Sequence, residues 1–166
     1  MNPAIVSVFR LGFLSLFLFV FSCTNEPPAA VAANEGRVVA IADGDTFTLL
    51  TDDKRQVKVR LHGIDCPEKK QDFGQVARQR LSELVFDKRV RLNIKDTDRY
   101  GRTVAVVYQN NACINEELLK EGLAWHYTRY DRNPEWERLE KEARRHKAGL
   151  WRQPHPTPPW EWRKEH

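Results

Sequence analysis

The chain has 166 residues, of which 41% are hydrophobic and 30% are charged. These proportions are ordinary for a soluble globular protein and exclude a chain that is too polar to bury a core. Lys and Arg outnumber Asp and Glu by 27 to 23, so the formal net charge is +4. A mildly basic chain allows a polyanionic partner without demonstrating one. The length fits one compact domain with short tails.

The first 22 residues have the pattern of an export signal. A single charge, Arg10, precedes an apolar run over residues 11–21, which is shorter than the roughly 20 residues that a membrane-spanning helix needs. The next residues, Phe21-Ser22-Cys23, resemble the end of a bacterial lipobox, although Phe21 is bulkier than usual. We therefore expect removal of residues 1–22 and lipidation of Cys23 as the first mature residue. Ordinary signal cleavage is the alternative, and either removal leaves a charge of +3, since 4 minus the one charge of Arg10 is 3.

The segment after the signal is expected to be a flexible tether. Residues 23–35 contain Pro27-Pro28 and show no amphipathic period, which is typical of a linker. We expect a folded domain over residues 36–152, followed by a Pro- and Trp-rich tail over residues 153–166 that is extended or loose. If Cys23 is lipidated, Cys66 and Cys113 remain as an even pair, and a disulfide between them is one possibility in an oxidising compartment.

Alternating apolar and polar residues predict five strands. Segments 37–42 and 46–51 are joined by Asp43-Gly44-Asp45, a turn of the hairpin kind. The same alternation appears over residues 57–61 and 90–94, where Ile94 is the last apolar position, and a fifth strand covers residues 103–108. Between the third and fourth strands, one helical face is predicted from Phe73, Val76, Ala77, Leu81, Leu84 and Val85.

Two further helices complete the predicted fold. Residues 114–121 read as a helix closed by Gly122, and a third helix starts at Asn133-Pro134 and ends near Gly149. Trp125, Trp136 and Trp151 are expected to be core anchors. The fold class is α+β, mainly a β barrel: a five-stranded OB-fold barrel with three helices, a type whose surface often receives nucleic acid.

Carboxylates cluster in two turns of the predicted barrel. Asp43 and Asp45 lie in the hairpin turn, and Asp65 and Glu68 follow the third strand. Oxygen donors of this kind suit a hard cation such as Ca²⁺. Turn-forming aspartates are the simpler explanation, because Asp is common in tight turns for local reasons.

Two arginines extend this candidate site. Arg60 alternates with the apolar residues of its strand and is expected on the outer face, and Arg102 follows a basic turn. Phosphodiester cleavage needs a bound cation, donors for the developing negative charge, and a group that activates or places water. The planar guanidinium fork suits the second task, since it donates two hydrogen bonds to one phosphate.

The ordered blocks DGDT (43–46), RLHGIDCPE (60–68), DRYGR (98–102) and INEELLKEGLAW (114–125) resemble the staphylococcal nuclease family over residues 37–151. The resemblance implies that Arg60, Glu68 and Arg102 are catalytic. It also implies that Asp45 and Asp65 bind Ca²⁺ together with the backbone carbonyl of Cys66. The best-known member has threonine at the position of Cys66, a departure that leaves a carbonyl ligand intact.

The implied activity is Ca²⁺-dependent hydrolysis of DNA and/or RNA that leaves 3′-phosphate and 5′-hydroxyl ends. Tyr100 and Tyr130 are expected either to contact the bound nucleotide or to pack within the fold. The basic residues expected to contact a nucleic-acid backbone are Lys69, Lys70, Lys88, Arg89, Arg91, Lys95 and Arg99.

We expect an exported monomer, anchored to a bacterial membrane through Cys23 and facing the periplasm or the cell surface, or secreted if the signal is cleaved in the ordinary way. The alternative function is a non-catalytic OB-fold envelope lipoprotein that binds nucleic acid. The presence of Arg60, Glu68 and Arg102 together favours the enzyme.

Overall fold

The computed structural model describes residues 34–166. The expected signal segment 1–22, the lipidation site Cys23 and the tether up to residue 33 lie outside this part of the chain. Among the described residues, no helix has the length and apolar character needed to cross a membrane.

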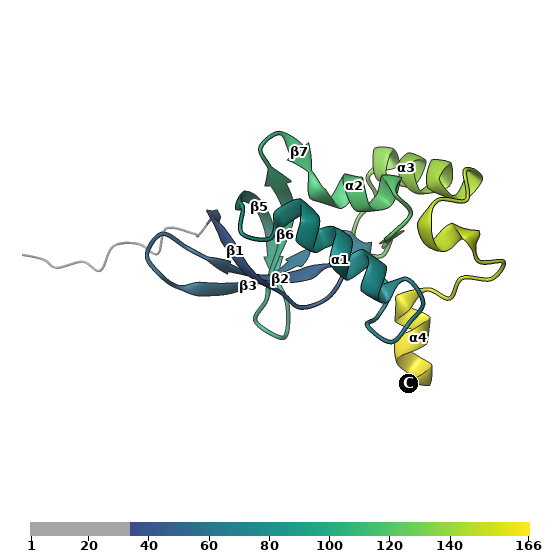
Figure 1. Ribbon diagram of the computed structural model, residues 1–166, viewed down its shortest axis with the longest axis horizontal. Coiled ribbons are helices and arrows are strands. Elements are labelled where there is room, and N and C mark those ends of the chain that lie inside the picture. The colour runs from purple at the N-terminus through teal and green to yellow at the C-terminus, as the bar shows by residue number, and fades with distance from the viewer. Residues whose placement is uncertain (1–33) are drawn as a thin grey trace, which may run out of the picture. The chain divides into compact units, whose positions relative to one another are not determined.

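A closed β barrel forms the centre of the described domain (Figure 1). Its five strands within residues 34–166 are β1 (Glu35–Ile41), β2 (Thr46–Leu50), β3 (Gln56–Leu61), β5 (Arg89–Thr97) and β6 (Thr103–Gln109). They follow the order β3-β2-β1-β5-β6, and a further pairing of β3 with β6 closes the barrel. The closing pair is parallel, whereas the other neighbours are antiparallel. The predicted five-stranded barrel of the OB type is confirmed.

Three two-residue strands lie outside the barrel. β4 (Ile64–Asp65) pairs with β8 (Trp125–His126), and β7 (Ala112–Cys113) extends the edge of β6. The β4–β8 pair connects the segment after β3 to the chain that follows the second helix. It thereby fixes Asp65 next to Trp125.

The three predicted helices are present as α1 (Gly74–Val85), α2 (Ile114–Lys120) and α3 (Pro134–Arg145). The start of α3 is the predicted one: the Asn133 side chain accepts a hydrogen bond from the backbone amide of Glu135 at 2.9 Å. The helix ends earlier than expected, at Arg145. Gly149 instead begins a short 3₁₀ helix, η1 (Gly149–Arg152).

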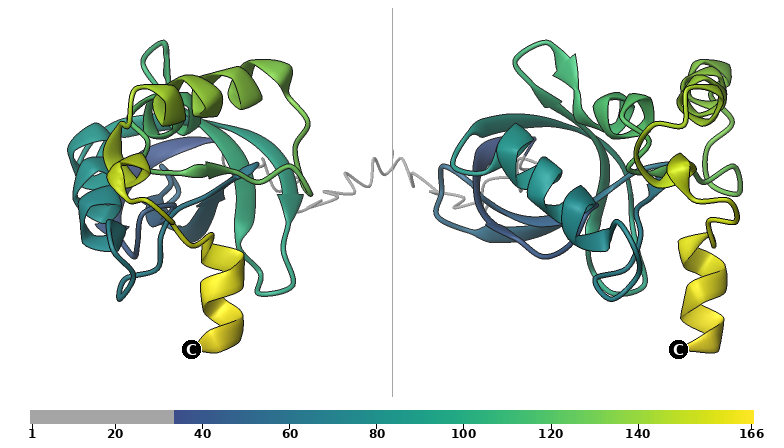
Figure 2. Two further views of the ribbon diagram at one scale, coloured as in Figure 1. Left: turned by 90° about the vertical axis from the view of Figure 1, so that its right-hand side faces the viewer. Right: turned by 45° about the vertical axis from the view of Figure 1, so that its right-hand side comes forward.

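A fourth helix, α4 (Pro159–Glu165), replaces part of the tail that we expected to be extended or loose. That expectation is wrong because Pro159 occupies the first helical turn, where proline needs no amide hydrogen bond. Trp160 then supplies an apolar anchor on the domain. Both views of Figure 2 show α3 and α4 at opposite ends of the domain, with α4 projecting from it.

The barrel core is built from the inward residues of the alternating strands. Along β3, Val59 and Leu61 are buried while Lys58 is exposed. Two predicted core positions are wrong: Val76 on α1 is 51% exposed and Ile94 on β5 is 37% exposed. Val76 lies on the outer side of a helix whose buried positions are Gly74, Ala77, Leu81 and Val85. Ile94 lies at an irregularity in the β5–β6 register and beyond the covered part of the barrel.

Trp125, Trp136 and Trp151 are core anchors, as predicted, with exposures of 8%, 3% and 7%. Trp136 joins the main core, whereas Trp125 and Trp151 form a second apolar cluster against which Trp160 packs. This second cluster gives the C-terminal segment a place to bind.

Cys66 and Cys113 are free thiols in the described structure, so the disulfide left open by the sequence is not formed. Cys66 is buried and Cys113 is partly exposed. Burial raises the pKa of both thiols, which keeps them protonated and weakens them as nucleophiles.

We predict that Leu81→Ala lowers the free energy of unfolding by about 2–5 kcal/mol, because it leaves a cavity at a fully buried position of α1. Val76→Ala on the same helix is the matched control and is expected to change stability by less than about 0.5 kcal/mol. Urea denaturation of both variants measures the difference. Equal effects would contradict the placement of α1 against the barrel.

Candidate functional site

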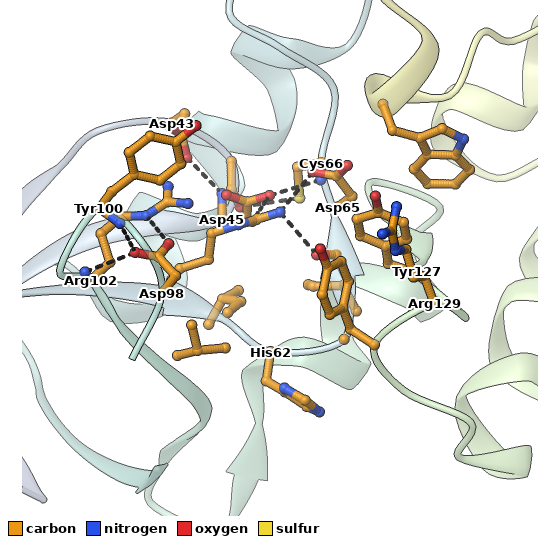
Figure 3. A pocket seen from close by; sticks show the side chains of 18 of the residues that line it. Asp43, Asp45, His62, Asp65, Cys66, Asp98, Tyr100, Arg102, Tyr127 and Arg129 are labelled. Atoms are coloured by element: carbon orange, nitrogen blue, oxygen red, sulfur yellow. Dashed lines mark hydrogen bonds and ion pairs between the residues drawn. The ribbon is translucent and has the colours of Figure 1, made fainter. Parts of the chain in front are cut away.

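A cleft of about 1090 Å³ opens on one side of the barrel (Figure 3). Its walls come from the β1–β2 turn, the end of β3, the segment around β4, the β5–β6 turn, residues 127–130 and α4. Arg60, Glu68, Arg102, Asp45, Asp65 and Cys66 all line it, as do Tyr100 and Tyr130. The structure thus brings the predicted site residues within the described chain together in one cleft.

Arg60 lies between two buried carboxylates. Its Nη2 donates to Asp65 Oδ1 at 2.8 Å, and its Nη1 forms an ion pair with Asp45. Asp45 and Asp65 are only 6% and 1% exposed. The pairing of β2 with β3 sets this geometry, because Thr46 is opposite Arg60 and therefore places Asp45 beside it.

The acidic side of the cleft is electrostatically crowded. Burial, with the nearby charge of Asp45, raises the pKa of Asp43 to about 6. Burial also raises the pKa of Asp65 above its usual value, although Arg163 and Arg60 act in the opposite direction. Burial would raise the pKa of Asp45 too, but the Arg60 guanidinium and the Cys66 amide outweigh it and hold that pKa below its usual value. A cation placed among these groups would relieve the crowding.

The β1–β2 turn is packed tightly against the cleft floor. The Cys66 amide donates to Asp45 Oδ2 at 3.0 Å, and the Cys66 thiol donates to the Gly44 carbonyl at 3.2 Å. A Cβ at Gly44 would lie 2.7 Å from that of Cys66 and 2.8 Å from that of Ala77. Only glycine fits there, so the turn, Cys66 and α1 together hold Asp45 in position.

Arg102 is held by the turn that precedes it. Its Nε donates to Asp98 Oδ2 at 2.7 Å, while Asp98 Oδ1 accepts from the amides of Tyr100 and Arg102 at 2.9 and 3.0 Å. Arg102 Nη1 also reaches Thr46 Oγ1 at 3.5 Å, next to Asp45. Figure 3 shows Arg102 and Asp98 on the side of the cleft opposite Tyr127 and Arg129.

Glu68 follows β4 at the edge of the cleft, with its side chain 37% exposed. Its backbone is fixed by Gln71, whose Oε1 accepts from the Glu68 amide at 3.1 Å. The start of α1 also packs there, since a Cβ at Gly74 would lie 1.8 Å from the Glu68 carbonyl oxygen. The Glu68 carboxylate pairs with Arg163 of α4 at 2.7 Å.

Tyr100 and Tyr130 are 69% and 62% exposed. Of the two alternatives that the sequence left open, packing within the fold is therefore excluded for both. Both lie on the cleft wall with arginines near their rings: Arg99 is 4.8 Å from the Tyr100 ring and Arg129 is 5.8 Å from that of Tyr130. Of the basic residues expected to contact a nucleic acid, Lys95 and Arg99 line the cleft. Arg89 instead pairs with Asp52 at 2.7 Å.

The donor set around Asp45 fits a hard cation in type. Within residues 34–166, no group of three or more Asp, Glu, His or Cys side chains converges as a metal site. Two carboxylates do converge on Arg60, and the backbone carbonyl of Cys66 accepts no hydrogen bond from another described residue. Two carboxylates, one carbonyl and waters are an oxygen-only set of the kind that Ca²⁺ takes.

Sequence reasoning named only Asp45 of the two carboxylates in the turn at residues 43–45 as a metal ligand, and it missed Arg163 of α4. The Asp43-Gly44-Asp45 turn contained a signal for Asp43, since its two carboxylates are two residues apart on one tight turn. Nothing in the local sequence distinguishes Arg163, because its role depends on where α4 packs.

Comparison with known proteins agrees with this geometry. Residues 58–153 match the family model described as staphylococcal nuclease homologue. An uncharacterized endonuclease of Haemophilus influenzae is 43% identical over 152 residues, which cover 92% of this chain and 82% of the relative.

Two further relatives also match most of this chain, and only one of them is named as a nuclease. Protein ParB of Escherichia coli is 46% identical, with 82% of each chain covered. A micrococcal nuclease of Shigella flexneri is 42% identical, with 78% of this chain and 80% of the relative covered. With its closed barrel and its matched residues 58–153, the chain belongs to the staphylococcal nuclease family.

Proposed function

We propose that this nuclease-type hydrolase is an exported, Ca²⁺-dependent enzyme that cleaves phosphodiester bonds of DNA and/or RNA and leaves 3′-phosphate and 5′-hydroxyl ends. The observation that carries the proposal is the convergence of Arg60 and Arg102 with Asp45, Asp65 and Glu68 in one cleft. The relatives named endonuclease and micrococcal nuclease support the same activity.

The two guanidinium groups of Arg60 and Arg102 would both bind the phosphate of the substrate. Asp45 and Asp65 hold Arg60, and Asp98 holds Arg102. Groups that are already oriented need no rearrangement as negative charge develops on the phosphate oxygens. Arginine remains charged at any relevant pH and donates through two parallel N–H groups. Arg60 and Arg102 would therefore stabilise the transition state.

Asp45, Asp65 and the Cys66 carbonyl are the residues that would hold Ca²⁺. When bound, the ion supplies charge for the phosphate and helps to place water. The burial of both carboxylates strengthens their interaction with a cation, because little solvent screens it.

Glu68 would accept or orient the proton of the attacking water. The water oxygen bonds to phosphorus as its proton passes to Glu68, the bond from phosphorus to the 5′ oxygen breaks, and the departing oxygen takes up a proton from solvent water to become the 5′-hydroxyl. Glu68 lies at the cleft edge, where water has access. A general base must first satisfy geometry, and its ion pair with Arg163 gives the carboxylate a defined position.

The exposed rings of Tyr100 and Tyr130 are placed to contact nucleotides next to the reacting phosphate. Both are on the cleft wall and present aromatic faces that stack on any base. A purely binding function for the barrel is less well supported, because it gives no reason for Arg60, Arg102 and Glu68 to surround a pair of buried carboxylates.

We predict that the purified protein degrades single-stranded DNA in the presence of Ca²⁺ and stops when a calcium chelator is added in excess. The expected cause is loss of the cation held by Asp45 and Asp65. Gel analysis of cleaved DNA measures the effect, with chelator preloaded with Ca²⁺ as the control. Full nuclease activity in the presence of excess chelator would contradict the proposed Ca²⁺ dependence.

We predict that Arg60→Lys and Arg102→Lys each lower kcat by about 100- to 1000-fold, because lysine keeps the charge but loses the donor fork. Arg138→Lys is the control and is expected to leave kcat unchanged, since Arg138 lies on α3, outside the cleft lining, and pairs with Glu135 and Glu142. Steady-state nuclease assays compare the three variants, with circular dichroism to verify folding. Normal turnover in folded Arg60→Lys or Arg102→Lys would contradict their role.

Export and membrane anchoring are supported by the sequence of residues 1–23. A lipidated Cys23 would attach the nuclease to a membrane through the tether at residues 23–35. Mass spectrometry of the mature amino terminus is expected to find an acylated Cys23. A mature chain that begins elsewhere and lacks the acyl groups would instead indicate ordinary cleavage and secretion.

A further inference from the structure

Arg163 brings a second guanidinium to the acidic side of the cleft from the far end of the chain. Its Nη2 donates to Asp65 Oδ2 at 2.7 Å, and its Nη1 donates to Glu68 Oε1 at 2.7 Å and to Asp65 Oδ1 at 3.3 Å. The Arg163 guanidinium therefore bridges Asp65, the proposed metal ligand, and Glu68, the proposed general base. Asp65 is 98 residues away in sequence, so only the packing of α4 creates this contact.

α4 is held against the domain by its apolar residues. Trp160 stacks on Tyr127, with ring centres 4.8 Å apart and planes 10° apart, and meets Trp125 edge-on at 5.6 Å. Pro159 is buried, and Gln71 Nε2 donates to the Thr157 carbonyl at 2.5 Å. Anchored on its inner side, α4 presents Arg163 at a defined position on the cleft wall.

The hydrogen bonds of Asp65 show which oxygen Arg163 occupies. Asp65 Oδ1 already accepts from Arg60 Nη2 at 2.8 Å, whereas Oδ2 accepts from Arg163 and from no other side chain of residues 34–166. Oδ2 thus has one donor, whereas Oδ1 has two, since Arg163 Nη1 also reaches it at 3.3 Å, and Oδ2 is the oxygen that a metal ion could take from Arg163 alone. A metal ion there would meet the Arg163 guanidinium, and two cations on one buried carboxylate repel each other strongly.

We propose that Arg163 is a built-in counter-ion of the metal site, which holds Asp65 and Glu68 when Ca²⁺ is absent and gives up Asp65 when Ca²⁺ binds. This inference rests on the proposed Ca²⁺ dependence. Arg163 weakens Ca²⁺ binding by competition. It also positions the Glu68 carboxylate, since its other nitrogen keeps that contact. Calcium affinity is therefore set partly by a helix outside the barrel.

The test is a calcium titration of the purified protein by calorimetry, which measures binding without substrate. Arg163→Gln keeps a polar side chain but removes the competing charge, and it is expected to tighten Ca²⁺ binding by roughly fivefold or more, the lower end of usual coupling between sites. Lys164→Gln is the matched control: Lys164 lies on the same helix, lines the same cleft and has no ion pair with residues 34–166. It is expected to change the affinity by less than about twofold.

The outcomes separate this inference from the proposed function. Tighter binding in Arg163→Gln alone supports it, whereas unchanged or weaker binding, or equal tightening in both variants, overturns it. Absence of calcium binding in the wild-type protein and in both variants would instead refute the proposed Ca²⁺ dependence and this inference with it. If Arg163→Gln does not fold by circular dichroism, Arg163→Lys serves in its place. That variant keeps the charge on a more mobile side chain and should tighten binding by a smaller factor, and no tightening would also overturn the inference.

Discussion

The parallel pairing of β3 with β6 is the contact on which the site depends. It closes the barrel in a register that sets Val59 against Thr103 and Arg60 against Val104. Arg60 is the next-to-last residue of β3 and points away from the core, and the turn that carries Arg102 leads into β6. Without closure the two guanidinium groups would belong to separate edges of an open sheet. Closure also removes the exposed strand edges that invite aggregation, so one set of backbone hydrogen bonds provides both the fold and the site.

Arg60 explains why two carboxylates are tolerated in an almost dry environment. A buried charge is costly unless it is paired and hydrogen-bonded, and Arg60 pairs with Asp45 and Asp65 at once. Each carboxylate also has other donors: the Cys66 amide for Asp45, and Arg163 for Asp65. The crowded negative charge of these carboxylates therefore makes the stability of the site depend on its arginines. A change to Arg60 is expected to lower stability as well as the proposed activity.

The C-terminal segment extends the family fold into the active cleft. The family match ends at residue 153, yet α4 lies beyond it and supplies Arg163, while Trp160 links α4 to Tyr127 in the cleft wall. The second apolar cluster, built on Trp125 and Trp151, gives this segment a surface to pack on. A helix outside the barrel thus contributes a charged residue to a cleft whose predicted catalytic and metal-binding residues lie in the barrel strands and the segments between them.

The sequence by itself determined the five strands of the barrel, three of the helices and the cleft residues Arg60, Glu68, Arg102, Asp45 and Asp65. Strands and helices could be predicted because the periodicity of apolar residues is a property of neighbouring residues. The residues Arg60 and Arg102 could be predicted because each belongs to a short motif, and the motifs follow one another in order along the chain. Local patterns misplaced Val76 and Ile94, because the exposure of a residue at the edge of a helix face or at a strand irregularity depends on what packs beside it. Only the tertiary structure decided the free state of the cysteines and the place of Arg163. A side chain that meets its partner 98 residues away has no local signal, since its position is set by how the helix carrying it docks on tryptophans from other parts of the fold.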